Sequence, residues 1–318
     1  MFLPVRANGG FQMLKYTIRK LVQLLITLFA ISVLVFLLVR LVPGDPVHNI
    51  LGLNVPQETL DAERARLGLD LPWPVQYWNF IKGVFQGDLG TSIYSKRPVV
   101  DEIAVKYAVT FKLAVGGVVV GSLLGICFGI LSATKHNKAI DSIISTISLL
   151  AVSTPLFFLS IIGMCIFCLK LGWLPSMGIK TPLHYVLPIC ILGFYSAGDI
   201  TRVTRSSMLD VLGQDYIRTS RAKGVPRRVI VFGHALKNAI IPVITSIGLR
   251  FGILLAGSTL VETVFSIPGM GRYLVDGVLN RDYPVVQGAV LVLTATFVIV
   301  NTLTDLIYAA VDPRIKYS

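Results

Sequence analysis

The sequence predicts an all-α integral membrane protein with six transmembrane helices, and its composition is the first reason. Of its 318 residues, 54% are hydrophobic and only 14% are charged, and the mean hydropathy is +0.73. Ordinary soluble domains are about a quarter charged, so this chain falls outside that class. The second reason is that apolar residues form runs of about 20, the length that a helix needs to cross a bilayer. These runs are residues 21–41, 109–134, 142–169, 187–203, 239–265 and 285–308.

Basic residues gather in alternate loops between these runs. The net charge is +12, and Lys and Arg concentrate on the cytoplasmic side of membrane proteins. We therefore expect both termini and the loop between the fourth and fifth spans to be cytoplasmic, and the charge does not indicate a nucleic-acid partner. The basic residues on this side are Arg6, Lys15, Arg19, Lys20, Lys135, Lys138, Arg202, Arg205, Arg218, Arg221, Lys223, Arg227, Arg228, Lys237, Arg314 and Lys316.

The first predicted region, residues 1–41, is an N-terminal tail and the first transmembrane helix. Its exit, Arg40-Leu-Val-Pro43, lacks a small-x-small cleavage site, so we expect an uncleaved anchor rather than a signal peptide. Residues 42–108 then form an extracytoplasmic loop. Within it, Tyr77, Trp78, Ile81, Val84 and Phe85 recur at helical spacing. This stripe predicts a helix that lies at the membrane interface or packs against the outer ends of the spans.

The second span carries Gly117, Gly121, Gly125 and Gly129 at four-residue spacing. All four lie on one helix face, where small residues let another helix approach closely. The pattern predicts tight packing, either within the chain or with a second subunit.

Residues 215–228, here called the basic island, separate the fourth span from the fifth. Asp215 can accept backbone N–H bonds at a helix start, Gly224 can end the helix in the left-handed conformation, and Pro226 suits the start of a new helix. We expect a helix of roughly two turns at the usual 3.6 residues per turn. Such a helix is either a site that docks in a groove of a cytosolic partner or a solvated loop.

Ionisable residues inside spans are candidates for function because burying them in lipid is costly. Arg250 lies near the middle of the fifth span, and Glu262 lies three turns later on roughly the same face. Both are candidates to line a translocation pathway, with a structural ion pair as the alternative. Asp305, near the inner end of the last span, is as well explained by an ion pair as by a role in transport.

The sequence has no catalytic constellation. Three patterns do not occur: the phosphate-binding Gly-x4-Gly-Lys-Ser/Thr, Gly-x-Ser-x-Gly and His-Glu-x-x-His. The histidines are scattered between loops and the four cysteines fall inside predicted spans, so we expect no metal site and no disulfide. If the chain moves a substrate, its energy comes from another subunit.

Many short motifs, in order, resemble the inner-membrane permeases of dipeptide, oligopeptide and nickel ABC importers, of the DppB/OppB type. They are Tyr16-Thr-Ile-Arg-Lys-Leu, Pro43-Gly-Asp-Pro46, Leu67-Gly-Leu-Asp70, Gly87-Asp-Leu-Gly90, Arg97-Pro98, Arg205-Ser-Ser-Met-Leu-Asp-Val-Leu212, the island from Asp215 to Gly224, His234-Ala-Leu-Lys-Asn238, Pro268-Gly-Met-Gly-Arg272, Arg281-Asp-Tyr-Pro284 and Asp312-Pro-Arg314. The resemblance implies a type I importer (MetI-like) fold in a bacterial inner membrane. It also implies a permease core at 109–308, a coupling segment at 206–238 and a cytoplasmic tail at 309–318.

In that family the basic island resembles the EAA loop, which docks on the ATPase. Here the Glu-Ala-Ala triplet reads Arg218-Thr-Ser220, and only Gly224 and Leu236 keep the general pattern. The Arg-Thr-x-Arg-Ala-Lys-Gly form is typical of peptide-type permeases. The resemblance implies ATPase-coupling roles for Asp215, Tyr216, Arg218, Arg221, Ala222, Gly224 and His234.

The resemblance further implies a second homologous permease, two cytosolic ATPase subunits that hold ATP and Mg, and an extracytoplasmic binding protein. This chain is then a transport subunit without ATPase activity or a cofactor of its own. The expected cargo is dipeptides or short oligopeptides, with nickel or a metal chelate as the alternative. Arg250 favours a carboxylate over a bare cation. A proton-coupled transporter with Asp199, Glu262 and Asp305 as a relay is a remote alternative, and a sensory or assembly protein is another.

Overall fold

The computed structural model describes residues 9–41, 44–52 and 55–311. Arg6, Pro43, Arg314 and Lys316 lie outside them. The chain divides into two compact units. Unit 1 comprises Met1–Lys20, Phe111–Ile267 and Phe297–Ser318, and unit 2 comprises Leu21–Thr110 and Pro268–Thr296.

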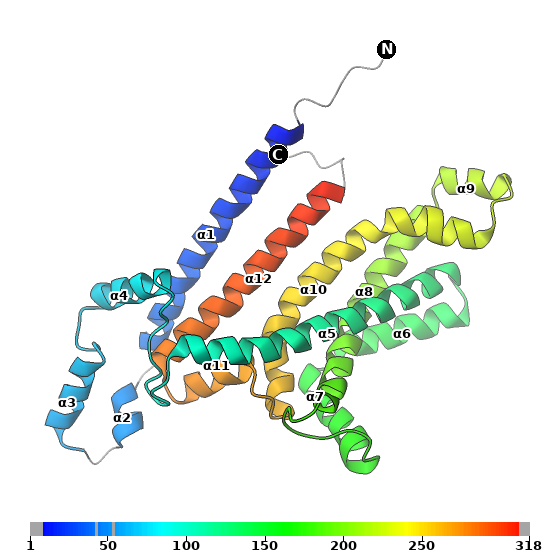
Figure 1. The fold of residues 1–318 in the computed structure, drawn as a ribbon. Helices are drawn as coiled ribbons and strands as arrows, with labels where there is room; N and C mark the ends of the chain where they lie inside the picture. The colour runs from blue at the N-terminus through cyan, green and yellow to red at the C-terminus, as the bar shows by residue number, and fades with distance from the viewer. Residues whose placement is uncertain (1–8, 42–43, 53–54, 312–318) are drawn as a thin grey trace. The chain divides into compact units, whose positions relative to one another are not determined.

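Among the described residues, five helices are long and apolar enough to cross a membrane (Figure 1), which agrees with five of the six predicted spans. They belong to α1 (Gly9–Leu41), α5 (Val99–Thr134), α8 (Leu183–Leu212), α10 (Leu236–Val264) and α12 (Tyr283–Val311). Most begin before the predicted apolar run, because polar first and last turns continue the helical hydrogen bonding beyond the lipid-facing stretch.

The third predicted span is not one continuous helix. It consists of α6 (Ala139–Ser153), followed by α7 (Leu156–Gly163) and a π-helical turn, η1 (Met164–Lys170). The two parts meet at an angle of 103°. Thr154 has an extended backbone, with φ −81° and ψ 127°, as expected for a residue before proline. Pro155 also has no N–H to continue the helical ladder. The pair is one broken span or a re-entrant segment.

Unit 1 is organised around α8, which packs against α6, α7 and α10. The glycine face of α5 lies directly on α8. A methyl group added to Gly117 would lie 2.8 Å from Leu192 Cβ, and one added to Gly121 would lie 2.6 Å from Ser196 Cβ. Gly129 approaches Thr204 in the same way. The four glycines therefore serve packing within the chain.

Gly125→Ala is expected to destabilise unit 1 by about 1–3 kcal/mol, the usual cost of overpacking. The new methyl group would lie 2.6 Å from Ile200 Cβ, so α5 would have to move away from α8. Gly213→Ala is the matched control, because its backbone is also right-handed and the nearest atom to its methyl group would be 3.5 Å away. Thermal unfolding of the purified protein should show a lower Tm for Gly125→Ala alone. Equal Tm values would contradict the packing role.

Unit 2 contains the predicted extracytoplasmic loop, folded as α2 (Pro46–Leu51), α3 (Gln57–Arg66) and α4 (Trp73–Phe85), together with α11 (Met270–Leu279). Asp45 caps α2 by accepting the Val47 N–H at 2.9 Å, and it also pairs with Arg64. Partial burial acts to raise the pKa of Asp45, but hydrogen bonds from Val47 N–H and Arg64 outweigh it, so the pKa lies below its usual value.

The aromatic stripe lies on α4 and divides between two faces. Tyr77 packs on α1, with its ring centroid 5.2 Å from that of Phe36 and its hydroxyl 2.9 Å from Ser32 Oγ. Trp78 and Phe85 are 68% and 87% exposed. One face of α4 therefore packs against a span, as one alternative predicted, while the exposed aromatic side chains suit the membrane interface. That second role stays a prediction.

A hydrophobic core in unit 2 joins the first turns of α5 and α12 to α11. Its buried residues are Val99, Ile103, Met270, Val285 and Ala289. Asp282 fixes the loop between α4 and α5, because its carboxylate accepts hydrogen bonds from Ser92 Oγ at 2.5 Å and from the Ile93 N–H at 3.1 Å. These contacts give the loop a defined structure of its own.

Candidate functional site

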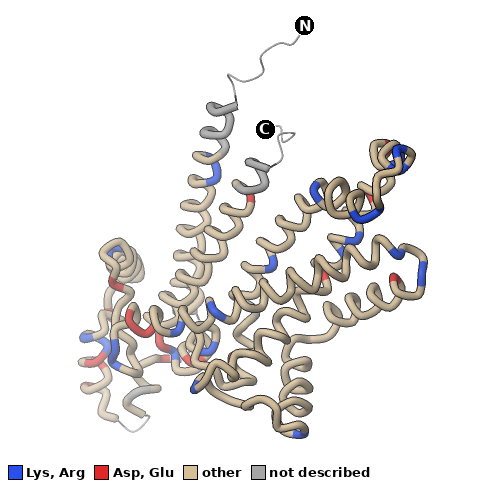
Figure 2. The backbone as a smooth tube through the Cα atoms, turned by 45° about the vertical axis from the view of Figure 1, so that its right-hand side comes forward, with Lys and Arg blue, Asp and Glu red and all other residues tan. Residues whose placement is uncertain are grey.

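The basic island forms a short helix, α9 (Asp215–Ala222), between α8 and a π-helical segment, η2 (Val229–Ala235), which runs directly into α10. The island thus links the fourth and fifth predicted spans. Figure 2 shows that many of the Lys and Arg residues of unit 1 lie around α9 and at the turn between α5 and α6. In unit 2 the two signs are mixed.

The two ends of α9 match the sequence prediction differently. Asp215 does not cap the helix, because the helix begins one residue earlier than predicted. Gln214 is the N-cap, without a side-chain capping bond, and Asp215 is already helical. Gly224 ends the helix with φ +76°, a left-handed conformation that glycine adopts without strain. Pro226 precedes the next helix, and its carbonyl accepts the Ile230 N–H at 3.1 Å.

One apolar side chain anchors α9 to the rest of unit 1. Ile217 is fully buried in a cluster that includes residues from α5, α8, η2 and α10. Its buried members are Ile130, Ala133, Met208, Ile217, Ile230, Val231, Ala235 and Ala239. Burying an isoleucine side chain contributes about 1.5–3 kcal/mol. Polar contacts add to this anchor: Asn238 Nδ2 donates to Tyr216 Oη at 2.8 Å, and Arg227 Nη2 donates to the Thr134 carbonyl at 2.7 Å.

The other predicted coupling residues point to solvent. Asp215, Tyr216, Arg218, Arg221, Ala222, Gly224 and His234 are all exposed. The Arg218 side chain is 74% exposed, and its contact with Asp215 at 3.6 Å is a surface ion pair of the kind that contributes little to stability. One face of α9 therefore presents cationic and aromatic side chains to solvent, while the buried Ile217 on the opposite face holds the helix to unit 1.

A groove of about 580 Å³ runs between α9 and the ends of α5 and α8. Its lining is mixed, because Thr134, Arg221 and Arg227 share it with apolar side chains. The apolar lining residues are Ala133, Leu209, Leu212, Val225, Ile230 and Val231. The groove is part of the same surface as the exposed face of α9.

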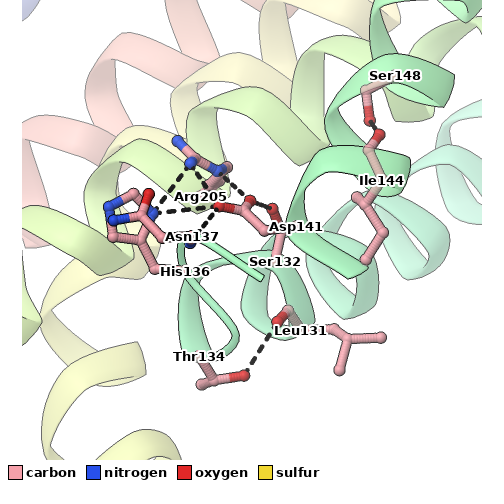
Figure 3. A network of polar contacts seen from close by, with 9 residues as sticks. All are labelled: Leu131, Ser132, Thr134, His136, Asn137, Asp141, Ile144, Ser148 and Arg205. Atoms are coloured by element: carbon pink, nitrogen blue, oxygen red, sulfur yellow. Dashed lines mark hydrogen bonds and ion pairs between the residues drawn. The ribbon is translucent and has the colours of Figure 1, made fainter. Parts of the chain in front are cut away.

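A polar network fixes the neighbouring turn between α5 and α6 to α8 (Figure 3). Arg205 Nε and Nη2 donate to the Asp141 carboxylate at 2.7 and 2.8 Å. Ser132 Oγ, at 2.5 Å, and the Asn137 N–H, at 3.1 Å, donate to the same carboxylate, and His136 Nδ1 lies 3.1 Å from it. Because a buried carboxylate is stable only when paired and hydrogen-bonded, the network holds three helix ends in one arrangement.

Arg250 has a carboxylate partner. Its Nη2 pairs with Asp199 Oδ2 on α8, and the two side chains are only 19% and 17% exposed. Asp199 also lines a groove of about 540 Å³ beside α6 and α8. A second cation is near, because Arg202 Nη1 lies 3.8 Å from Asp199 Oδ1. The structure therefore contains an ion pair, as the structural alternative predicted, but the pair is only partly buried. The pathway role of Arg250 stays a prediction.

Glu262 does not share a site with Arg250. It is fully buried and accepts Ser258 Oγ at 3.0 Å. Twelve residues along one helix correspond to about 18 Å, so the two candidates act separately. Asp305, the other acid considered, pairs with Lys20 Nζ at 2.7 Å. In the part of the chain that the structure describes, no group of three or more His, Cys, Asp or Glu could hold a metal ion.

Sequence reasoning missed the polar network and the anchor. Asp141 lies just before the third predicted span, and a lone acid beside the basic Lys135 and Lys138 was a signal that could have found it. Ile217 is the large aliphatic residue among the polar neighbours of α9, and this contrast was a signal for its burial. Asp199 gave no sign of its pairing with Arg250, since the two residues are on different helices.

An all-helical fold with several helices able to cross a membrane, two of them linked by an exposed basic helix, defines a multi-pass membrane protein. Two family descriptions match the chain: "Binding-protein-dependent transport system inner membrane component" over residues 125–317 and the corresponding N-terminal region over residues 13–114. The chain belongs to this family and is a permease of the ABC importer class, located in the inner membrane. The resemblance noted from its motifs is confirmed.

Curated relatives cover almost the whole chain. The glutathione transport system permease protein GsiC of Pectobacterium atrosepticum is 47% identical over 305 residues, 96% of this chain and 100% of the relative. The proteins of the same name from Salmonella typhi and Escherichia coli K12 are 45% and 44% identical over the same lengths.

Solved structures show the same fold. The inward-facing MetNI methionine ABC transporter aligns with a TM-score of 0.57 and 19% identity over 66% of this chain and 96% of that one. An amino acid ABC transporter with histidines aligns with a TM-score of 0.52 and 17% identity over 66% and 94%. The predicted MetI-like architecture is confirmed.

Proposed function

We propose that this chain is the transmembrane subunit of an ATP-driven importer of short peptides, which an extracytoplasmic binding protein delivers. The observation that carries the choice of cargo is the near full-length similarity to glutathione permeases, because glutathione is itself a tripeptide. Arg250 adds no support, since Asp199 neutralises the charge that would attract a peptide carboxylate.

In the proposed complex, a second homologous permease completes the pathway and two cytosolic ATPase subunits bind ATP and Mg. The exposed face of α9 docks in a groove of one ATPase subunit, with Arg218 and Arg221 at the contact. Both termini and α9 are then cytoplasmic, and the loop at residues 42–108 is extracytoplasmic, where the binding protein delivers the substrate. The support is that α9 combines an exposed basic face with a buried base.

The contacts of Ile217 explain how such docking reaches the spans. A movement of α9 acts on a cluster with members on α5, α8, η2 and α10, and the Asp141–Arg205 network ties the α5–α6 turn to α8. Because packed cores shift between discrete arrangements rather than deforming smoothly, we expect α9 and these helix ends to move as one body. ATP binding to the partner ATPase would thereby switch the pathway between its outward-open and inward-open states.

Uptake assays test the proposed cargo. Cells with the cognate ATPases and binding protein, with or without this gene, are given labelled glutathione, labelled dialanine and nickel. We expect loss of peptide uptake alone when the gene is deleted. Loss of nickel uptake alone would overturn the peptide proposal and place the chain with the metal-importing branch.

A further inference from the structure

Unit 2 contains a cavity of about 430 Å³, within the size range of small-molecule sites. It is formed by the end of α1, the loop before α4, α4 itself, the segment after it and the start of α12. The polar side chains that line it include Arg40, Arg66, Gln76, Asp88 and Gln287. None of these residues belongs to the basic island or to the Arg250 pair.

Within the part of the chain that the structure describes, Arg40 is held in place without a carboxylate partner. Its Nε and Nη2 donate to Gln76 Oε1 at 3.0 and 2.7 Å, and its Nη1 donates to the Phe36 carbonyl at 3.2 Å. The guanidinium carbon lies 3.5 Å from the centroid of the Phe36 ring. Three of the five N–H donors are therefore used, and two remain.

Other arginines of the extracytoplasmic loop are neutralised. Arg64 pairs with Asp45 and Asp61, and Arg66 pairs with Glu63 at 2.6 Å. Within the described residues no carboxylate lies within ion-pair distance of Arg40. The hydrogen bonds of Arg40 replace part of its lost solvation but supply no opposite charge, so an anion entering the cavity would be favoured.

A second group points to the same ligand. Gln287 is 5% exposed, it lines the cavity, and its buried Nε2 has no hydrogen-bond partner among the described residues. An unsatisfied buried donor is destabilising, and a carboxylate oxygen that reached Nε2 would satisfy it. Gln76 is committed elsewhere, because its Nε2 donates to the carbonyls of Leu69 and Leu71 at 3.2 and 2.7 Å.

We propose that this cavity binds the carboxylate of a short peptide, with Arg40 and Gln287 as its donors. Asp88 also lines the cavity, where its Oδ1 accepts the Gly90 N–H at 2.8 Å, and this single negative charge suits a zwitterionic ligand better than a simple anion. The inference rests on the proposed function for the class of ligand. It adds a recognition site on the permease itself, separate from the binding protein.

Binding of dialanine to the assembled transporter in nanodiscs, without binding protein, tests the site by calorimetry. Dialanine amide, which lacks the carboxylate, is the comparison ligand. We expect the amide to bind at least about 10-fold more weakly, since a charge-assisted hydrogen bond contributes about 1.5–3 kcal/mol. Equal binding of the two peptides, or no binding of either, would overturn the proposal.

Four variants test which side chains bind the carboxylate of dialanine. Arg40→Gln and Gln287→Glu should each weaken dialanine binding about 10-fold or more. Arg40→Lys keeps the charge if the first variant fails to fold, and should weaken binding by loss of the two-pronged donor. Arg97→Gln is the matched control, because Arg97 is exposed and pairs with Glu102 at 3.1 Å; its binding should not change.

The outcomes separate this site from the proposed function. If cells take up no peptide but dialanine binds through Arg40, the site stands and the importer's proposed cargo is wrong. If uptake occurs and Arg40 variants bind dialanine normally, the site is wrong and the cargo stands. If those variants bind dialanine but lose the binding protein, the cavity receives an acidic side chain of that protein, which also overturns the proposal.

Discussion

Reversing the charges of Arg218 and Arg221 together (R218E/R221E) is expected to abolish uptake while the protein accumulates in the membrane at its normal level. Both side chains are exposed, and exposed substitutions rarely change stability by more than about 0.5 kcal/mol. At a docked interface, losing one partner of a desolvated charged contact costs about 2–5 kcal/mol, or roughly 30- to several-thousand-fold in affinity. Uptake and membrane abundance, measured in the same cells, separate docking from folding.

The control for this variant must change the charge on the same side of the membrane, because topology itself depends on Lys and Arg. K135E/K138E meets that condition at the α5–α6 turn. It should retain most uptake. If both double variants lose uptake equally, the effect belongs to the overall charge and the assignment of α9 as the docking helix fails. Gly224→Asp, which forces a side chain onto a backbone with φ +76°, should resemble R218E/R221E.

Arg250→Gln is expected to lower the amount of folded protein, because it leaves Asp199 without its main counter-charge. Breaking a buried ion pair typically costs about 3–5 kcal/mol, whereas removing both charges is often nearly neutral. The double variant D199N/R250Q should therefore recover most of the stability that the single variant loses. Thermal unfolding of the purified proteins and their abundance in the membrane measure this.

The alternative for Arg250 gives a different pattern. If Arg250→Gln accumulates normally and changes only the transport of anionic cargo, its side chain lines the pathway and the ion pair is not its main role. If D199N/R250Q is as unstable as the single variant, the pair does not explain the loss.

Local patterns predicted the parts of the structure that local physics determines. Long apolar runs predicted five spans, and Gly224 predicted the end of α9, because a left-handed residue after a short helix favours glycine. The break at Thr154 was missed because residues 142–169 contain no charged residue and are mostly apolar, although Pro155 was a visible warning. The apolar content of a segment indicates that it can lie in lipid. Whether the segment is one straight helix depends also on whether each residue has a backbone N–H to continue the helical hydrogen bonds, and proline has none.

The pairings between helices could not be predicted from one sequence. Asp199 meets Arg250, and Asp141 meets Arg205 across 64 positions. Each contact depends on which helix lies next to α8, and helix propensity does not contain that information. The glycine face of α5 was recognised as a packing surface, but its partner, α8, became known only from the structure.

Co-purification of the cognate ATPase with the tagged chain tests the central claim, that α9 is the docking site, most directly. The wild-type chain and K135E/K138E should retain the ATPase after detergent extraction, and R218E/R221E should lose it while keeping the partner permease. An R218E/R221E chain that retains the ATPase in full would contradict the account.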